Sequence, residues 1–200
     1  VPVTQIVDNA FNKCSDIVTV LIPDTLTRIG IGAFEGCSSL EKFEVYVVDP
    51  ASTTPKIYSS ADGALLFFDE ASGNTYLELF PRAKTGTYTI PENVDNVRPY
   101  AFKNSRLEKV IISKGVKYIA ESAFYKCSKL HTIEFEFGRE ESVTIENNAF
   151  NELPKVETLI LPAKLNVIED LKTLDKLEAL KTIQVEAGGE NYSATENLLC

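Results

Sequence analysis

One apolar pattern recurs along the chain and constrains its fold more than any other feature. The segment Ala123–Phe135 reads A-F-x-x-C-x-x-L-x-x-I-x-F when only its apolar positions are kept. Copies of the pattern are anchored at Phe11, Phe34, Phe102, Phe124 and Phe150, and one further copy is anchored at Leu174. Successive anchors on either side of one long interruption are 22 to 26 residues apart. That period is typical of a solenoid built from short repeats.

A unit of this length cannot bury its own apolar face, so neighbouring copies must stack on one another. The L-x-x-[VIF]-x-[VIF] centre of each copy predicts a leucine-rich repeat solenoid with a parallel β-sheet on one face. The A-F-x-x-C segments are too short for a stable α-helix, and we expect them to form short helical or 3₁₀ turns. Each anchor phenylalanine is predicted to be buried in the core.

The repeat is interrupted between residues 46 and 87. Asp49–Pro55 has the composition of a loop. The apolar runs Ala64–Phe68 and Thr75–Phe80 flank Ser72-Gly73-Asn74, which predicts an inserted β-hairpin. Residues 192–199 align without gaps on residues 58–65, so the end of the chain is predicted to begin a second hairpin of the same kind.

Composition bounds the domain organisation and excludes some function classes. We expect residues 1–200 to form a single leucine-rich repeat domain of about six repeats. A net charge of −9 argues against nucleic acid or an anionic membrane as the partner. No apolar run has the roughly 18 residues of a membrane span, and the N-terminus lacks the features of a signal peptide. Because methionine and polar capping units are absent, we expect a piece of a longer protein.

The A-F-x-x-C-x-x-L units, the prolines that follow the strands and the inserted Y-S-x-x-D-G-x-L-x-F segment resemble the BspA-like (Treponema pallidum-type) leucine-rich repeats. This resemblance covers nearly the whole chain. It implies a secreted or surface-anchored protein of a host-associated bacterium, with an extracellular or cell-surface location. It also implies a role as an adhesin or protein-binding module, and it brings no catalytic residues.

The cysteines are the first candidates for chemistry. Cys14, Cys37 and Cys127 occupy the same repeat position, which holds Ser105 and Leu153 in other copies. A position that accepts serine or leucine favours a small buried side chain, so we favour buried free thiols over a Cys14–Cys37 disulfide. No zinc-ligand spacing is present, and we predict no cofactor and no metal site.

The other candidates are titratable residues. His131 is the sole histidine, and its outward strand position favours a surface residue over a catalytic one. The acidic pairs Asp69-Glu70 and Glu140-Glu141 could serve a glycan-active enzyme. Both pairs fall in predicted turns, where solvated charge is the ordinary interpretation, so we predict that the chain is not an enzyme.

The outward face of the predicted sheet is the remaining candidate for a partner-binding surface. Its side chains are Thr19, Leu21, Lys42, Glu44, Lys109, Ile111, Thr132, Glu134, Thr158 and Ile160, followed by Thr182 and Gln184. Apolar residues rimmed by charge suit a protein partner, although scattered surface apolar residues are also common. The leading hypothesis is a non-enzymatic binding or adhesion module. The alternative is a structural spacer that holds other domains away from the cell surface.

Overall fold

A computed structural model describes residues 2–166, 177–188, 194–195 and 198–199. The chain divides into two compact units, residues 1–84 and 85–200. Each contains stacked turns with parallel strands, so the predicted leucine-rich repeat solenoid is confirmed. That the two units form a single domain stays a prediction. The repeat copy anchored at Leu174 begins outside the described residues. Asn191–Ser193 and Cys200 also lie outside them.

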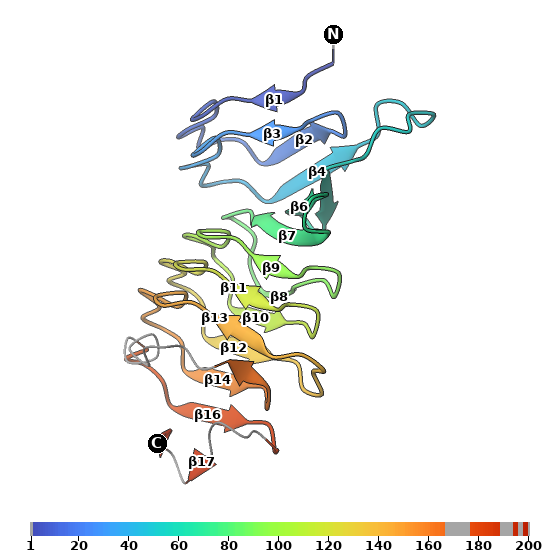
Figure 1. Cartoon of the computed structure of the whole chain (residues 1–200). Helices are drawn as coiled ribbons and strands as arrows, with labels where there is room; N and C mark the ends of the chain where they lie inside the picture. The colour runs from blue at the N-terminus through green and yellow to red at the C-terminus, as the bar shows by residue number, and fades with distance from the viewer. Residues whose placement is uncertain (1, 167–176, 189–193, 196–197, 200) are drawn as a thin grey trace. The chain divides into compact units, whose positions relative to one another are not determined.

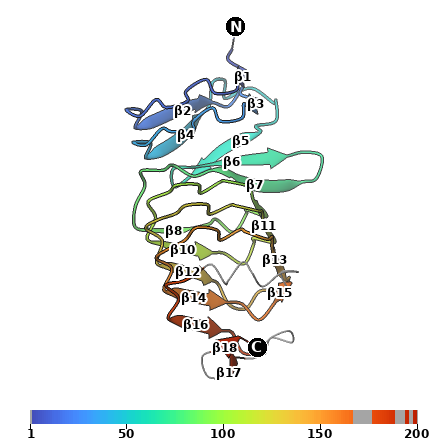
Figure 2. The same ribbon diagram turned by 90° about the vertical axis from the view of Figure 1, so that its left-hand side faces the viewer.

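The second unit carries two parallel sheets, one on each side of its core (Figures 1 and 2). The first is formed, in spatial order, by β8 (Thr87–Thr89), β10 (Lys109–Ile112), β12 (Thr132–Phe135), β14 (Thr158–Leu161) and β16 (Thr182–Val185). The second is formed by β9 (Asn96–Val97), β11 (Tyr118–Ile119), β13 (Val143–Ile145) and β15 (Leu165–Asn166). The sequence predicted the first sheet. The second forms because the return segment of each turn also pairs with its neighbours.

The register of the first sheet follows the repeat. Lys109 is paired with Thr132, Thr132 with Thr158, and Thr158 with Thr182. Equivalent repeat positions therefore form columns that run from strand to strand, as in-register stacking requires. Inward residues such as Val110 and Ile133 are fully buried, because side chains alternate between the two faces of a strand.

The first unit begins with the same arrangement and continues into the insertion. β1 (Gln5–Ile6) pairs with β3 (Arg28–Ile29), and β2 (Thr19–Pro23) pairs with β4 (Lys42–Tyr46), both in parallel. β5 (Tyr58–Ala61), β6 (Ala64–Asp69) and β7 (Asn74–Leu79) then form an antiparallel meander. The predicted hairpin is β6 and β7, and β5 is a strand that the sequence analysis did not assign.

The second hairpin is confirmed in its described residues. β17 (Ala194–Thr195) pairs antiparallel with β18 (Leu198–Leu199), with Ala194 opposite Leu199. Ser60 and Leu65, which align with Ala194 and Leu199, are paired in the first meander. The two segments therefore share a register as well as a sequence pattern.

The anchor phenylalanines stack through the cores of the two units. In the second unit the rings of Phe102 and Phe124 are 4.5 Å apart and nearly parallel, and Phe150 lies 5.5 Å beyond Phe124. All three are buried, as is Phe34 in the first unit. The prediction is wrong for Phe11, which is 38% exposed. Its ring stacks on Phe34 on one side, and burial in a solenoid needs a neighbouring turn on both sides.

The expected helical or 3₁₀ turns are wrong, because no helix of either kind occurs in the residues that the structure describes. The anchor segments are consecutive hydrogen-bonded turns. The residues two before and two after each anchor have positive φ, a conformation incompatible with a right-handed helix. They are Asn9 and Lys13, Gly32 and Gly36, Tyr100 and Asn104, Ser122 and Lys126, and Asn148 and Glu152.

These left-handed residues let each turn bond to the next one along the stack. The amide of Asn104 donates to the carbonyl of Tyr125 at 2.9 Å, and the amide of Phe124 donates to the carbonyl of Ala149 at 3.0 Å. A helical turn would direct these amides back into its own segment. The turn edge is therefore a third hydrogen-bonded ladder, besides the two sheets.

A glycine at a left-handed position should be more stable than a bulky residue. Lys13 has a φ of 61° and is exposed, and Gly36 holds the equivalent position in the next turn. We expect Lys13→Gly to raise the free energy of unfolding by about 0.5–1 kcal/mol, because glycine adopts this conformation without steric strain. Urea denaturation measures the change, and Lys13→Asn should give a smaller gain. A loss of stability in both variants would contradict the assigned backbone conformation.

Candidate functional site

The outward side chains of the first sheet form two columns in the second unit. Lys109, Thr132 and Thr158 lie in one column, with Thr87 before them and Thr182 after them. The other column contains Thr89, Ile111, Glu134, Ile160 and Gln184. The structure thus brings together the predicted residues of this unit. It adds Thr87 and Thr89 from β8, which the sequence analysis missed because their strand follows the insertion directly.

The columns combine apolar and charged groups at short range. The ammonium of Lys109 lies 2.6 Å from a carboxylate oxygen of Glu134, in the other column. Glu134 is flanked by Ile111 and Ile160, both partly exposed. The result is a surface with apolar positions on both sides of one ion pair. A protein surface with complementary groups can bury this combination.

The first unit presents a smaller version of the same surface. Thr19 is paired with Lys42, and Leu21 with Glu44. Leu21 is 62% exposed, and an ion pair of 2.6 Å joins Lys42 to Glu44 on the neighbouring strand. The four predicted residues therefore lie together, with one large apolar side chain beside a charged pair.

The cysteines are free thiols, as predicted, in all three described positions. Cys37 and Cys127 are buried, whereas Cys14 is exposed, so the prediction of burial is wrong for Cys14. Cys14 shares the first complete turn with Phe11, which is also exposed. The thiol of Cys127 donates to the carbonyl of Phe102 at 3.0 Å and accepts from the Ser105 hydroxyl at 3.3 Å. Where this repeat position holds Cys37 or Cys127, the thiol therefore donates to a carbonyl of the previous turn.

Burial should make these thiols unreactive. It raises the pKa of Cys127 to about 11 and also raises the pKa of Cys37, because a buried thiolate is poorly solvated. In a Cys200→Ser background at pH 8, we expect iodoacetamide to label Cys14 and to leave Cys37 and Cys127 unmodified until the protein is unfolded. Mass spectrometry of tryptic peptides measures the labelling. Modification of Cys127 as fast as Cys14 in the native protein would contradict its packing.

The titratable candidates are exposed or take part in turns and ion pairs. His131 is exposed at the start of β12, as predicted. Asp69 accepts hydrogen bonds from the Ser72 hydroxyl at 2.6 Å and the Ala71 amide, so it stabilises the hairpin turn. Glu140 and Glu141 are exposed, and Glu141 forms an ion pair with Lys117. Glycoside hydrolysis requires a partly buried carboxylic acid as proton donor, and neither glutamate is buried.

Arg139 is a buried charged residue that the sequence analysis missed. Its guanidinium donates to the carbonyls of Ser113, at 2.8 Å, and Val116. Burial lowers the pKa of Arg139, while Glu136 and Glu186 oppose the shift. The available signal was the step of 26 residues from Phe124 to Phe150, the longest outside the interruption, because the extra residues place Arg139 over the previous turn.

Asp24 fastens the loop that leads into the insertion. Its carboxylate accepts a hydrogen bond from the amide of Val48 at 3.0 Å and forms an ion pair of 3.0 Å with Lys56. The Val48 hydrogen bond, and secondarily Lys56, lower the pKa of Asp24 below its ordinary value. The loop before β5 is therefore tied to the end of β2 by one ionised side chain.

This attachment should depend on pH. Because the folded-state pKa of Asp24 is lowered, its stabilisation is present above the unfolded pKa of about 3.9 and is lost as the pH falls through the folded value. We expect Asp24→Asn to reduce the protection of the Val48 amide from hydrogen exchange at neutral pH and to abolish the acid-induced loss of protection expected in the wild type. Asp49→Asn is the control, because the Asp49 carboxylate accepts from the Ala51 amide within the same loop. Equal exchange at Val48 in wild type and Asp24→Asn would contradict this role.

The described part of the chain contains no group of three or more His, Cys, Asp or Glu residues placed to bind a metal ion. In the same residues, no helix has the length and apolar character needed to cross a bilayer.

The sequence profile of the BspA type leucine rich repeat region matches residues 2–59 and 78–188, in six copies. The chain belongs to this family. The unmatched residues 60–77 hold most of the β5–β7 meander, so this BspA-type chain carries an insertion where the sequence analysis placed one. No curated protein matches the sequence.

Solved structures of bacterial repeat proteins share the fold of this BspA-type chain. A leucine rich cell surface protein from Faecalibacterium prausnitzii A2-165 is 23% identical over 92% of the chain, with a TM-score of 0.61. The chain covers 51% of that protein, about half its length. A leucine-rich repeat protein from Bacteroides capillosus is 18% identical over 65% of the chain, with a TM-score of 0.56, and the chain covers 99% of that protein. The pneumococcal vaccine antigen PcpA is 17% identical over 92% of the chain, and the chain covers 60% of that protein, with a TM-score of 0.49.

Proposed function

We propose that this chain is a non-enzymatic, extracellular binding or adhesion module that presents the outward face of its strands to a protein partner. The observation that carries the proposal is the pair of in-register columns on β8–β16, where Ile111 and Ile160 flank the Lys109–Glu134 ion pair. A surface of this kind loses little by exposure to water and gains apolar burial in a complex. Membership of a repeat family also supports a binding role over catalysis, because solenoids offer extended surfaces for recognition.

A cell-surface location is part of this proposal. It is supported by the fold shared with the Faecalibacterium cell surface protein. The insertion gives the module a second feature for recognition, because Phe68 near the hairpin tip is 40% exposed. Residues 60–77 lie outside the repeat profile, so the hairpin adds a surface that the repeats themselves do not supply.

The test is adhesion of beads that carry the purified protein to cultured epithelial cells. Leu21→Glu and Ile111→Glu place a carboxylate on the outward face of each unit, and we expect either change to reduce adhesion about tenfold. Ile31→Glu is the matched control, because Ile31 is 84% exposed in a turn and lies outside the sheet. Undiminished adhesion of both face variants would refute the proposed face, and absence of adhesion by the wild type would favour the spacer hypothesis.

A further inference from the structure

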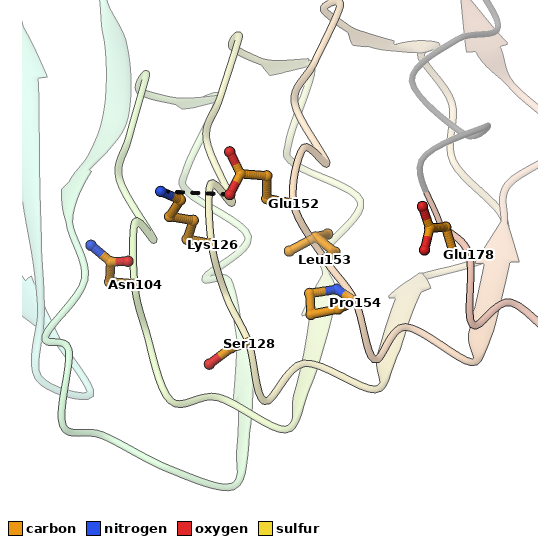
Figure 3. Close-up of a pocket in the computed structure, with 7 residues that line it drawn as sticks. All are labelled: Asn104, Lys126, Ser128, Glu152, Leu153, Pro154 and Glu178. Carbon is orange, nitrogen blue, oxygen red and sulfur yellow. Dashed lines mark ion pairs between the residues drawn. The ribbon is translucent and has the colours of Figure 1, made fainter.

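An open groove crosses the turn edge of the second unit, away from the outward columns. Its volume is about 480 Å³, within the range of small-molecule sites. The lining residues belong to successive turns (Figure 3). They are Asn104, Lys126, Ser128, Glu152, Leu153, Pro154 and Glu178. Most lie two or four residues after an anchor, so the repeat itself places them in rows along the groove.

The groove has a mixed lining, and its polar side chains offer both donors and acceptors. Lys126 and Ser128 can donate hydrogen bonds, Glu152 and Glu178 can accept them, and the Asn104 amide can do both. Two carboxylates against one ammonium give the lining a net charge of −1, which disfavours phosphate, sulfate and acidic sugars. Of the two apolar lining residues, Leu153 is fully buried and Pro154 is exposed.

Tyr125 lies beside Lys126, one of the lining residues, and packs against Tyr100. Tyr100 and Tyr125 pack edge to face, with ring centroids 6.1 Å apart, and Tyr100 is 51% exposed. The ammonium of Lys126 lies 4.9 Å from the Tyr125 ring and 3.5 Å from a carboxylate oxygen of Glu152. Figure 3 shows Lys126 and Glu152 directed toward each other across neighbouring turns. Lys126 thus contacts both the aromatic pair and Glu152 of the groove.

The backbone holds these groups in place before any ligand arrives. Tyr100, Lys126 and Glu152 all have positive φ, although glycine or asparagine adopts this conformation at lower energy. The amides of Asn104 and Lys126 bond to the following turn, at 2.9 and 3.3 Å, which fixes the spacing of the rows. A preorganised site loses less entropy on binding than a flexible one.

We propose that this groove binds a neutral saccharide. Sugar rings present a C–H face that packs on an aromatic ring, and their hydroxyl groups donate and accept hydrogen bonds at the same atom. The groove supplies mixed donors and acceptors along its length, and Lys126 joins it to the neighbouring tyrosine pair. This site shares no residue with the outward columns proposed for the protein partner.

The test is titration with maltotriose, cellotriose and triacetylchitotriose up to about 20 mM, followed by amide NMR. Tyrosine fluorescence gives a second readout, because the chain contains no tryptophan. We expect at least one trisaccharide to cause saturable shifts at Asn104, Ser128 and Glu152, with a Kd on the order of 1 mM. Tyr100→Asn and Glu152→Gln should each weaken that binding about tenfold.

The variants are chosen to fold. Asparagine already holds the position of Tyr100 at Asn9 and Asn148 in other turns, and glutamine keeps the size of Glu152. Ile111→Glu, on the outward face, should leave saccharide binding unchanged, so the two proposals fail separately. Absence of saturable shifts with all three sugars would overturn the inference. Shifts that both groove variants leave intact would also overturn it, as would binding of neutral hexapeptides at these residues in place of sugars.

Discussion

Phe124→Ala should lower the free energy of unfolding by about 3–5 kcal/mol, the cost of a large core cavity. Phe124 is 1% exposed and lies between two other rings, 4.5 Å from Phe102 and 5.5 Å from Phe150. Its removal therefore breaks two aromatic contacts and leaves a void between three turns. Urea denaturation followed by circular dichroism measures the change.

Phe11→Ala is the matched control, because it removes the same ring at the same repeat position. Phe11 is 38% exposed and stacks on Phe34 alone, so its loss should cost about 1–2 kcal/mol. Equal effects of the two substitutions would mean that burial between turns does not determine stability. The stacked core would then be the wrong account of this fold.

Gly115→Ala should cost about 3 kcal/mol, because the new methyl group has no room. An ideal Cβ at this position would lie 1.8 Å from the carbonyl oxygen of Glu92 in the previous turn. The neighbour is backbone of the segment between β8 and β9, so it cannot rotate away as a side chain would. Thermal and urea denaturation should both show the loss.

Gly86→Ala separates this clash from backbone strain. Gly86 has a φ of 79°, and an added Cβ would meet no atom within 4 Å. Its substitution should therefore cost only the strain of a left-handed alanine, about 1 kcal/mol. If Gly115→Ala costs no more than Gly86→Ala, the close approach of the two turns is wrong.

The stacking of the turns was predictable because it depends on a periodic property. A buried column needs an apolar residue at the same place in every turn, and Phe34, Phe102, Phe124 and Phe150 meet that need. The hairpin followed from turn residues between two apolar runs. Both signals lie in the sequence itself and require no knowledge of neighbouring side chains.

The conformation of the anchor turns was not predictable in this way. Glycine and asparagine favour positive φ, but Tyr100, Lys126 and Glu152 do not, so their identities gave no signal for this conformation. At Lys126 the left-handed backbone directs the amide to the carbonyl of Asn151 in the next turn. Arg139 was missed for a related reason. Its guanidinium is satisfied by two carbonyl groups of the previous turn, and these residues are 26 and 23 positions away in the chain. The outward columns could be predicted residue by residue except for Thr87 and Thr89 of β8, whereas the groove exists only where side chains of successive turns meet.

The ladder of left-handed turns separates what this molecule needs in order to fold from what it can vary. Backbone atoms make the hydrogen bonds of that ladder, so the side chains at its surface are not needed for these bonds and can differ from turn to turn. Single substitutions there can exchange an amide for an ammonium or a carboxylate, as Asn104, Lys126 and Glu152 illustrate in adjacent turns. A protein built on this plan can acquire new specificity one turn at a time while its interior stays unaltered.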